Sequence, residues 1–247
     1  MWDFDDLDLS ESRFRALLDG EADRAGILTQ LARIEGLRGR FAEGELLLAE
    51  AEAAGGAEGW VQIERGRLLR SGGDEAAARP LFEAAFETAL AAGDGFLAGD
   101  AAHMAALVGD PEGWTARGLE LARHSDDPGA RYWLGGLLNN IGWSRFESGD
   151  FAGALAAFEE ALELRSGEPE RPYARELARY AVGKTLRALG RLDEATLQLE
   201  AAVAWSDEAG VETPYFYEEL AECYAATGRP EAARAQARRA AEAQPPP

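Results

Sequence analysis

The tripeptide Gly183-Lys184-Thr185 is the first set of residues in this sequence that could do chemistry. In a phosphate-binding loop, glycine-rich backbone amides cradle the phosphates, the lysine reaches the outer phosphates and the hydroxyl binds Mg²⁺. That motif needs a second glycine five residues before Gly183, where this chain has Ala178. The surrounding sequence, ELARYAVGKTLRALG, has a helical pattern and not the strand–loop–helix pattern of such a site. We therefore interpret the tripeptide as part of a helix and expect no nucleotide cofactor.

The other residues with catalytic or metal-binding potential are too few or wrongly spaced. His103 and His124 are the only histidines, and they do not form the His-x-x-x-His pair of a zinc site. A single cysteine, Cys223, excludes an intramolecular disulfide framework and a zinc site built on cysteines. Carboxylate pairs such as Glu159-Glu160 are spaced as on a solvated helix face, and no nucleophile elbow is present. The sequence thus predicts no catalytic residue, no metal site and no cofactor, and an enzyme is the least favoured class.

Charge and composition narrow the possible partners. The chain has 247 residues, 47% of them hydrophobic, and its 45 Asp and Glu against 25 Lys and Arg give a net charge of -20. A surface of this sign repels nucleic-acid phosphates and anionic membranes, so we expect neither as a partner. No apolar run approaches the ~18–20 residues that cross a bilayer, and the acidic N-terminus is unlike a signal peptide. We expect a cytoplasmic protein, and the scarcity of lysine beside abundant alanine and glycine suggests a bacterial source.

Six glycines share one spacing of small and large residues around them. A small residue precedes each glycine by seven positions, the residue nine after is usually large, and the residue twelve after is small in five of six cases. A small residue usually stands five after as well. Around Gly149 these positions hold Gly142, Phe158, Ala161 and Ala154. Gly109 fits worst. The six glycines, 34 to 41 residues apart, are Gly39, Gly73, Gly109, Gly149, Gly190 and Gly228.

This spacing is typical of helical hairpins that stack side by side. The glycine ends the first helix in a left-handed conformation that other residues resist. An acidic residue then begins the second helix, as at Asp74, Asp110 and Asp150. Small residues seven before and five after let the two helices approach, and seven residues are about two helical turns, so these positions share a face.

The stretch Leu137–Leu164 resembles the tetratricopeptide repeat family, with Gly142, Gly149-Asp150-Phe151, Ala154, Phe158 and Ala161-Leu162 in the family's positions. The resemblance extends over about residues 25–242. The longer periods look like the extended-helix variant of kinesin-light-chain-like and peptide-sensing members. The resemblance implies an all-α fold, an α-α superhelix (solenoid) of about six hairpins, each stabilised by its neighbours. A non-repeat helical bundle is the alternative, and the register of the third repeat, around Gly109, stays open.

The remaining segments flank this solenoid. We expect residues 1–24 to form an acidic N-terminal segment with a short leading helix at 10–19, capped by Asp8 or Ser10. Residues 243–247 should form a C-terminal tail.

The resemblance also implies where binding occurs. The first helices of the hairpins line the concave face, and the positions ten, six and three before each turn glycine point into it. These eighteen positions carry five of the 25 cations and only two acids, so we predict a basic and aromatic groove. Its predicted residues are Arg33, Ile63, Arg67, Arg70, His103, Asn139, Trp143, Phe146, Tyr180, Lys184 and Arg187.

Such a groove would suit an extended acidic peptide of a partner protein. Its cations would pair with carboxylates, its aromatic rings would take apolar side chains, and Asn139 would hydrogen-bond the peptide backbone. We therefore expect a non-enzymatic scaffold or adaptor, with a chaperone-like role as a variant. A sensory or regulatory domain that tightens around a small peptide or ligand is the alternative. A further possibility is that the arginines pair with neighbouring acids of the chain itself.

The N-terminal sequence MWDFDDLDL alternates acids with apolar residues, among them Trp2 and Phe4, which is what this groove would accept. One hypothesis is that the segment folds back onto its own solenoid or docks into that of a neighbouring molecule. An end cap or a frayed tail is the alternative. The sequence leaves the partner and the oligomeric state open.

Overall fold

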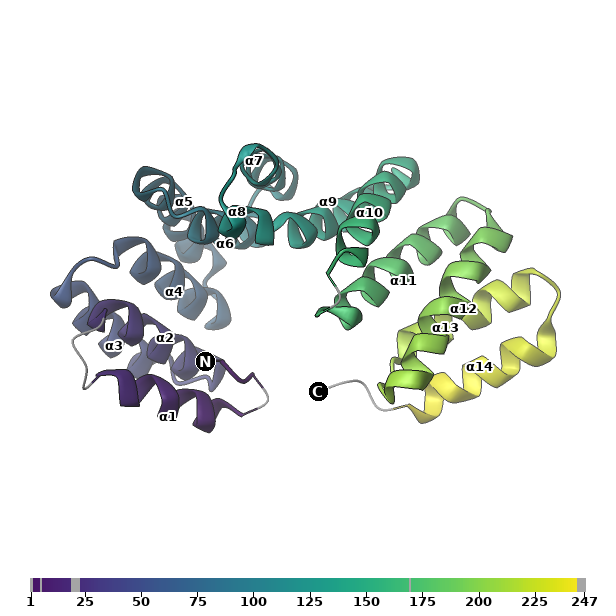
Figure 1. Cartoon of the computed structure of the whole chain (residues 1–247), viewed down its shortest axis with the longest axis horizontal. Coiled ribbons are helices and arrows are strands. Elements are labelled where there is room, and N and C mark those ends of the chain that lie inside the picture. Colours follow the sequence, from purple (N-terminus) through teal and green to yellow (C-terminus); the bar gives the residue numbers. More distant parts are fainter. Residues whose placement is uncertain (1, 5, 19–22, 169, 244–247) are drawn as a thin grey trace. The chain divides into compact units, whose positions relative to one another are not determined.

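The computed structural model describes residues 2–4, 6–18, 23–168 and 170–243, and within them all regular structure is helical (Figure 1). A leading helix α1 (Leu7–Leu18) precedes six antiparallel hairpins, and a short helix α8 (Pro128–Tyr132) follows the third. The hairpins are α2 (Arg24–Leu37) with α3 (Phe41–Ala54), α4 (Glu58–Ser71) with α5 (Glu75–Ala92), α6 (Gly95–Val108) with α7 (Pro111–His124), α9 (Leu134–Ser148) with α10 (Phe151–Ser166), α11 (Pro172–Ala188) with α12 (Leu192–Ala209), and α13 (Pro214–Ala226) with α14 (Pro230–Glu242). The described residues therefore form an all-α solenoid of six hairpins.

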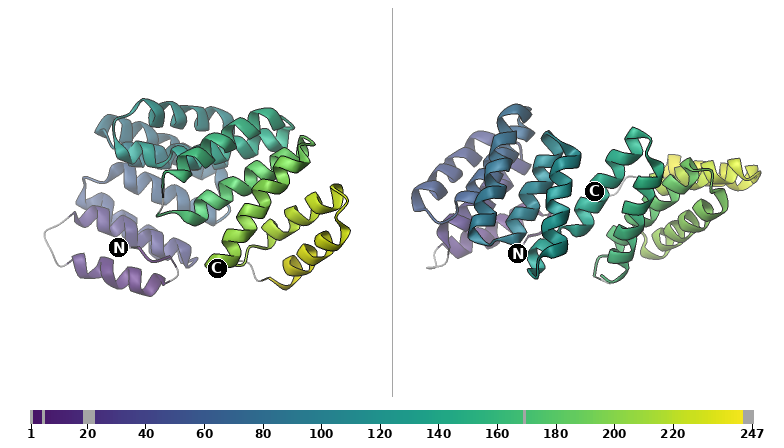
Figure 2. Two further views of the ribbon diagram at one scale, coloured as in Figure 1. Left: turned by 45° about the vertical axis from the view of Figure 1, so that its right-hand side comes forward. Right: turned by 90° about the horizontal axis from the view of Figure 1, so that it is seen from above.

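The chain divides into two compact units, Met1–Leu134 and Gly135–Pro247. The first unit contains three hairpins, together with α1 and α8, and the second contains the other three. Figure 2 shows the paired helices of each unit from two further directions. Each unit has its own buried core, and the two are described separately.

The turns between paired helices follow the predicted glycines with one exception. Gly39, Gly73, Gly149, Gly190 and Gly228 all have a positive φ, between 74° and 92°. Gly109 has a φ of -146° instead, so the third hairpin turns differently. There Asp110 Oδ1 accepts a hydrogen bond from the Gly113 amide at 2.9 Å, and α7 begins at Pro111. The third hairpin is thus present, with a turn of its own.

The helix caps are as predicted except at α1. Asp74, Asp110 and Asp150 each accept a hydrogen bond from the backbone amide three residues further on. Helix α1 begins at Leu7 and not at residue 10, because Asp6 Oδ1 caps it by accepting from the Leu9 amide at 2.8 Å. Ser10 is buried and bonds the backbone of Asp3 instead of capping the helix. Residue 19, the expected end, lies outside the described residues.

The small residues seven before the turn face the large residues nine after it. A Cβ built on Gly142 would lie 2.3 Å from Phe158 Cε1, and one built on Gly66 would lie 2.5 Å from Phe82 Cε1. Both phenylalanines are fully buried. The absence of a side chain at these positions is therefore what allows the two helices of a hairpin to approach closely around one aromatic ring.

Substituting Gly142 by valine should destabilise the second unit by about 1–3 kcal/mol, because the new side chain overpacks the Phe158 site. Gly167→Val is a matched control, since its Cβ would meet only the Leu164 carbonyl oxygen at 3.4 Å. Urea unfolding followed by circular dichroism checks this. Equal unfolding midpoints for the two variants would show that the hairpin tolerates a side chain at position 142.

The first helices of the hairpins form one layer within each unit. Helix α2 contacts α4, α4 contacts α6, and α11 contacts α13, whereas the second helices make no comparable contacts with one another in the part of the chain that the structure describes. Helices crowd together on the concave side of a curved stack. We call the side lined by α2, α4 and α6 the inner face of the first unit. The side lined by α9, α11 and α13 is the inner face of the second.

Candidate functional site

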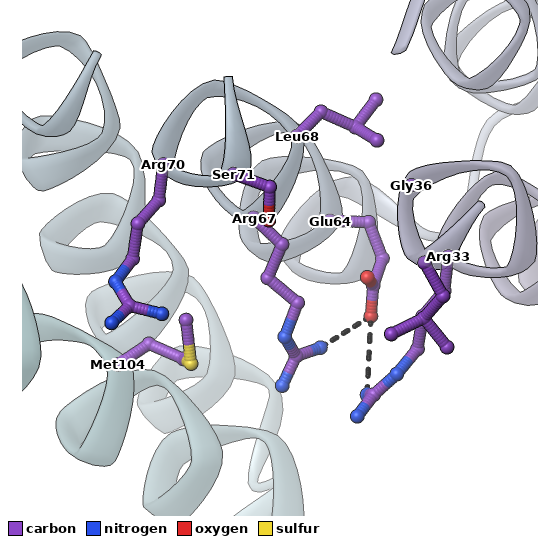
Figure 3. A pocket seen from close by; sticks show the side chains of 9 residues that line it. Arg33, Gly36, Glu64, Arg67, Leu68, Arg70, Ser71 and Met104 are labelled. Atoms are coloured by element: carbon purple, nitrogen blue, oxygen red, sulfur yellow. Dashed lines mark hydrogen bonds and ion pairs between the residues drawn. The ribbon is translucent and has the colours of Figure 1, made fainter. Parts of the chain in front are cut away.

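The inner face of the first unit contains a pocket of about 200 Å³ between α2, α4 and α6. Three of the predicted arginines line it, Arg33 from α2 and Arg67 and Arg70 from α4. In Figure 3 their side chains extend from two neighbouring helices to the same side, and Met104 of α6 lies beside Arg70. The structure therefore brings three cations together around one small cavity.

Two of these arginines are paired with buried carboxylates. Arg67 Nη1 donates to Glu64 Oε1, and its Nη2 donates to Asp100 Oδ1 at 2.6 Å. Arg33 Nη1 lies 3.6 Å from the same Glu64 oxygen. The two acids are only 1% and 2% exposed. The possibility that the arginines pair with acids of the chain itself therefore holds for Arg33 and Arg67.

The acids of these pairs share a position that the sequence analysis missed. Glu64, Asp100 and Glu219 each stand nine residues before a turn glycine. In three cases the cation six before one turn pairs with the acid nine before the next turn. The pairs are Arg33 with Glu64, Arg67 with Asp100, and Lys184 with Glu219. A count of acids at this position is the sequence signal that would have found them.

Burial governs the electrostatics of this cluster. Desolvation raises the pKa of the Glu64 carboxyl, against the opposing effect of Arg67 and Arg33. Desolvation also lowers the pKa of Arg33, and the neighbouring charge of Arg67 adds to this. Burial opposes the charge of Arg67 as well, but Glu64 and Asp100 more than compensate and raise its pKa. Arg67 is thus held charged by carboxylates in a site poor in water.

Arg70 differs from its two neighbours because its guanidinium has no ion pair with any described residue. Its Nε is buried and has no hydrogen-bond partner, although the side chain as a whole is half-buried and lines the pocket. A buried donor without a partner costs about 1–3 kcal/mol. The planar fork of guanidinium N–H groups matches a carboxylate. Arg70 is therefore the cation of this face that is available to a ligand.

Two other predicted residues of the first unit are placed differently. Ile63 is fully buried and packs in the core that contains Phe82, so the prediction that it lines the groove is wrong. His103 is half-buried, and its ring stacks on Trp133 with centroids 5.4 Å apart. Gly99 makes room for this indole, since a Cβ there would lie 2.4 Å from Trp133 Cδ1.

The position of His103 predicts a loss of stability on acidification. Burial lowers the pKa of its imidazole below the ordinary 6.5. The charge of Asp100 opposes this effect, and the charges of Arg67 and Arg70 add to it. The neutral ring is favoured in the folded state. Its contribution to the free energy of unfolding is therefore complete above pH 6.5 and is lost as the pH falls below that value. Urea midpoints should drop more between pH 7.5 and 5.5 for the intact chain than for His103→Gln. Equal drops would contradict the account.

The inner face of the second unit carries an aromatic wall across α9, α11 and α13. The Trp143 ring lies 5.6 Å from Phe146 and 6.4 Å from Tyr180, measured between centroids. Tyr180 in turn lies 5.1 Å from Tyr215, whose hydroxyl is 2.7 Å from that of Tyr173. The sequence analysis missed Tyr173 and Tyr215, because they lie beyond the three positions that it considered on each helix.

The cations of this second face are paired internally. Lys184 Nζ donates to Glu219 Oε2 at 3.0 Å, and Arg187 Nε donates to the other oxygen of the same carboxylate. Glu219 is buried, so it holds both cations against the helices. Asn139 is half-exposed, and its amide has no hydrogen bond to any described residue. Among the predicted residues that the structure describes, this second face thus offers aromatic rings and an amide, and its two cations are paired.

The residues considered for chemistry are explained by the fold. Gly183, Lys184 and Thr185 lie inside α11, where the threonine hydroxyl donates to the Ala181 carbonyl at 2.7 Å. Burial raises the pKa of Cys223 to about 11, which keeps this thiol unreactive. Across the described residues no group of histidines, cysteines and carboxylates is arranged to hold a metal ion. Nor is any described helix both long enough and apolar enough to cross a membrane.

The hairpin formed by α9 and α10 matches a known family model. Residues 136–167 match the model of the tetratricopeptide repeat. This hairpin is therefore similar to a tetratricopeptide repeat. In this repeat Gly142, Gly149 and Phe158 have the roles predicted from their spacing, since the first and last make the close contact and the second makes the turn. No curated protein matches the sequence.

Solved structures share the all-α fold over nearly the whole chain. A tetratricopeptide repeat protein from Parabacteroides merdae is 15% identical, covers 96% of this chain and 87% of its own, and gives a TM-score of 0.52. The apo form of the quorum sensor NprR from B. thuringiensis is 14% identical, with coverages of 96% and 82% and a TM-score of 0.61. The APC/C hetero-tetramer Cut9-Hcn1 is 16% identical with a TM-score of 0.60, and this chain spans 42% of the matched chain's length. The predicted α-solenoid is confirmed.

Proposed function

We propose that this chain is a non-enzymatic protein-interaction module that binds an acidic peptide segment on the inner face of its first unit. The observation that carries the proposal is Arg70, an arginine with a buried, unpartnered Nε in a pocket. Its neighbours Arg33 and Arg67 are fixed by Glu64 and Asp100, so the pocket is rigid before a ligand arrives. A preorganised site loses less entropy when it binds.

The size and charge of the pocket indicate what enters it. Drug-sized ligands occupy about 300–1,000 Å³, whereas this pocket measures about 200 Å³ and fits a single side chain. Three arginines face two carboxylates, which leaves one positive charge when both acids are ionised. One carboxylate side chain of an extended peptide matches both the volume and the net charge of the pocket.

The inner face of the second unit supports the same function through different contacts. Its aromatic wall would take apolar side chains of a partner, and the amide of Asn139 can both donate to and accept from a peptide backbone. Because Lys184 and Arg187 already share Glu219, the affinity of a peptide for this face should depend less on salt than its affinity for the Arg70 pocket.

A sensory or regulatory domain is the second candidate. It is favoured by the fold shared with NprR, which is described as a quorum sensor. Small-angle scattering separates the two candidates. The radius of gyration of a sensor should decrease when it binds a peptide, whereas that of an adaptor should stay the same.

Selection from a random twelve-residue peptide library on the full-length protein tests the proposed function. Binding peptides should be enriched in Asp or Glu, and binding should fall at least tenfold for Arg70→Ala. The same selection on the Arg70→Ala protein is the control, and it should not enrich acidic residues. Recovery of no binders, or of binders indifferent to Arg70, would remove the proposal.

A further inference from the structure

The segment formed by residues 2–4 lies on the first helices of the first unit. Trp2 Nε1 donates to Gln30 Oε1 at 2.9 Å, and the Trp2 ring stacks on Phe4 with centroids 5.0 Å apart. The Arg33 guanidinium lies 5.6 Å from the centre of the Trp2 ring and 5.9 Å from that of the Phe4 ring. The segment therefore covers an arginine that also lines the pocket.

The two rings differ in what holds them. Trp2 packs against Phe14 and so extends the first core, as an end cap does. Phe4 is 61% exposed, and its ring contacts are with Trp2 and Arg33. An end cap gains little from a phenyl ring left in water, whereas a ring placed over a cation is a contact used in recognition.

Hydrogen bonds attach the segment to α1 and α2. Between Asp3 and α1, the Ser10 hydroxyl accepts from the Asp3 amide at 2.7 Å and donates to its carbonyl at 2.8 Å. The indole N–H of Trp2 donates to Gln30 of α2, and the Asp3 carboxylate accepts from the Asp6 amide at 3.2 Å. The segment adds these contacts to the outside of α1 and α2, so its rings can leave α2 without breaking a contact between the hairpins.

We infer that residues 2–4 are a tethered occupant of this inner face and compete with the bound peptide for the surface over Arg33. This inference rests on the proposed function. A peptide that places a carboxylate on Arg70 and continues across α2 meets the two rings and must displace them. The tether is short, so the effective concentration of the segment is in the millimolar range. Even a weak contact then lowers the apparent affinity several-fold.

Titration of a library-selected peptide into three full-length proteins tests the inference. These are the intact chain, the double variant Trp2→Ala/Phe4→Ala, and the control Leu46→Ala/Leu197→Ala, which removes two exposed leucines from α3 and α12. The first double variant should bind about three- to tenfold more tightly than the intact chain, and the control should not change. Phe4→Ala alone leaves the core contacts of Trp2 intact and should give part of the gain.

The indole N–H signal of Trp2 in an NMR spectrum reports displacement directly, and its loss in the Trp2→Ala protein assigns it. Added peptide should shift it away from its position in the Gln30-bonded state. An unmoved signal together with equal or weaker affinity of the double variant overturns the inference. If binding still requires Arg70 in that case, the proposed function stands. If neither protein yields an Arg70-dependent peptide, the proposed function and this inference fail together.

Discussion

Glu64→Ala is expected to lower the free energy of unfolding by about 3–5 kcal/mol. The carboxylate is 1% exposed and is shared by Arg33 and Arg67, so its removal leaves two largely desolvated cations without their common partner. Asp100 would still hold Arg67, but no described acid other than Glu64 pairs with Arg33. Urea or thermal unfolding of the full chain, followed by circular dichroism, measures the loss.

Two further variants separate this effect from ordinary loss of charge. Glu64→Gln keeps the shape and one acceptor for Arg67, so it should be less harmful than alanine. Glu45→Ala removes a half-exposed partner of Arg65, which lies on the same helix as Arg67, and such exposed pairs contribute about 0–1 kcal/mol. If Glu64→Ala were as mild as Glu45→Ala, the three-arginine pocket would not be held together by its buried acid.

Arg70→Ala should weaken binding of an acidic peptide by about 10- to 150-fold. Hydrogen bonds to charged groups contribute about 1.5–3 kcal/mol, and a factor of ten in affinity corresponds to about 1.4 kcal/mol. The folded protein should be as stable as the intact chain or more so, because the substitution also removes a buried donor without a partner. Isothermal titration calorimetry with a library-selected peptide measures the affinity.

The same experiment contains its own controls. Arg65→Ala makes an identical change on α4, but Arg65 pairs with Glu45 and Glu52 and does not line the pocket. It should leave peptide affinity within about twofold. Arg70→Lys keeps the charge and loses the planar fork, so it should fall between the two. Affinity that is the same in low and high salt would contradict a role for charge in this pocket.

The solenoid could be predicted from the sequence because one contact determines it repeatedly. A glycine seven before the turn meets a large side chain nine after it, and Gly142 with Phe158 shows how little space is left. Steric requirements of this kind leave a visible pattern of small and large residues. The turn at Gly109 was the uncertain one, and the structure shows why, since its φ is not left-handed.

The candidate site could be predicted only in part. Arg33, Arg67 and Arg70 line one pocket, but their positions on the helices could not show which of them lacks an ion pair. That depends on acids from the neighbouring hairpin, such as Asp100, whose distance from Arg67 is set by how the hairpins stack. The prediction that Ile63 lines the groove was wrong for a related reason, because this side chain packs in the core of its own unit.

Cations at two positions of the repeat have different surroundings in the first unit. The cations six before a turn connect one repeat to the next through a buried acid, as Arg67 does with Asp100. The cation three before the turn is not needed for that connection in the first unit, and Arg70 remains available. In the second unit Arg187, at the equivalent position, is held by Glu219. We therefore place recognition of the carboxylate in the first unit.

NMR observation of the arginine Nε–Hε groups while a selected peptide is added tests this account most directly. The Arg70 signal should shift progressively, and its titration curve should give the dissociation constant measured by calorimetry. The Arg65 signal should not move, since that side chain faces away from the pocket lining. A peptide that saturates the protein while the Arg70 signal stays in place would contradict the central claim.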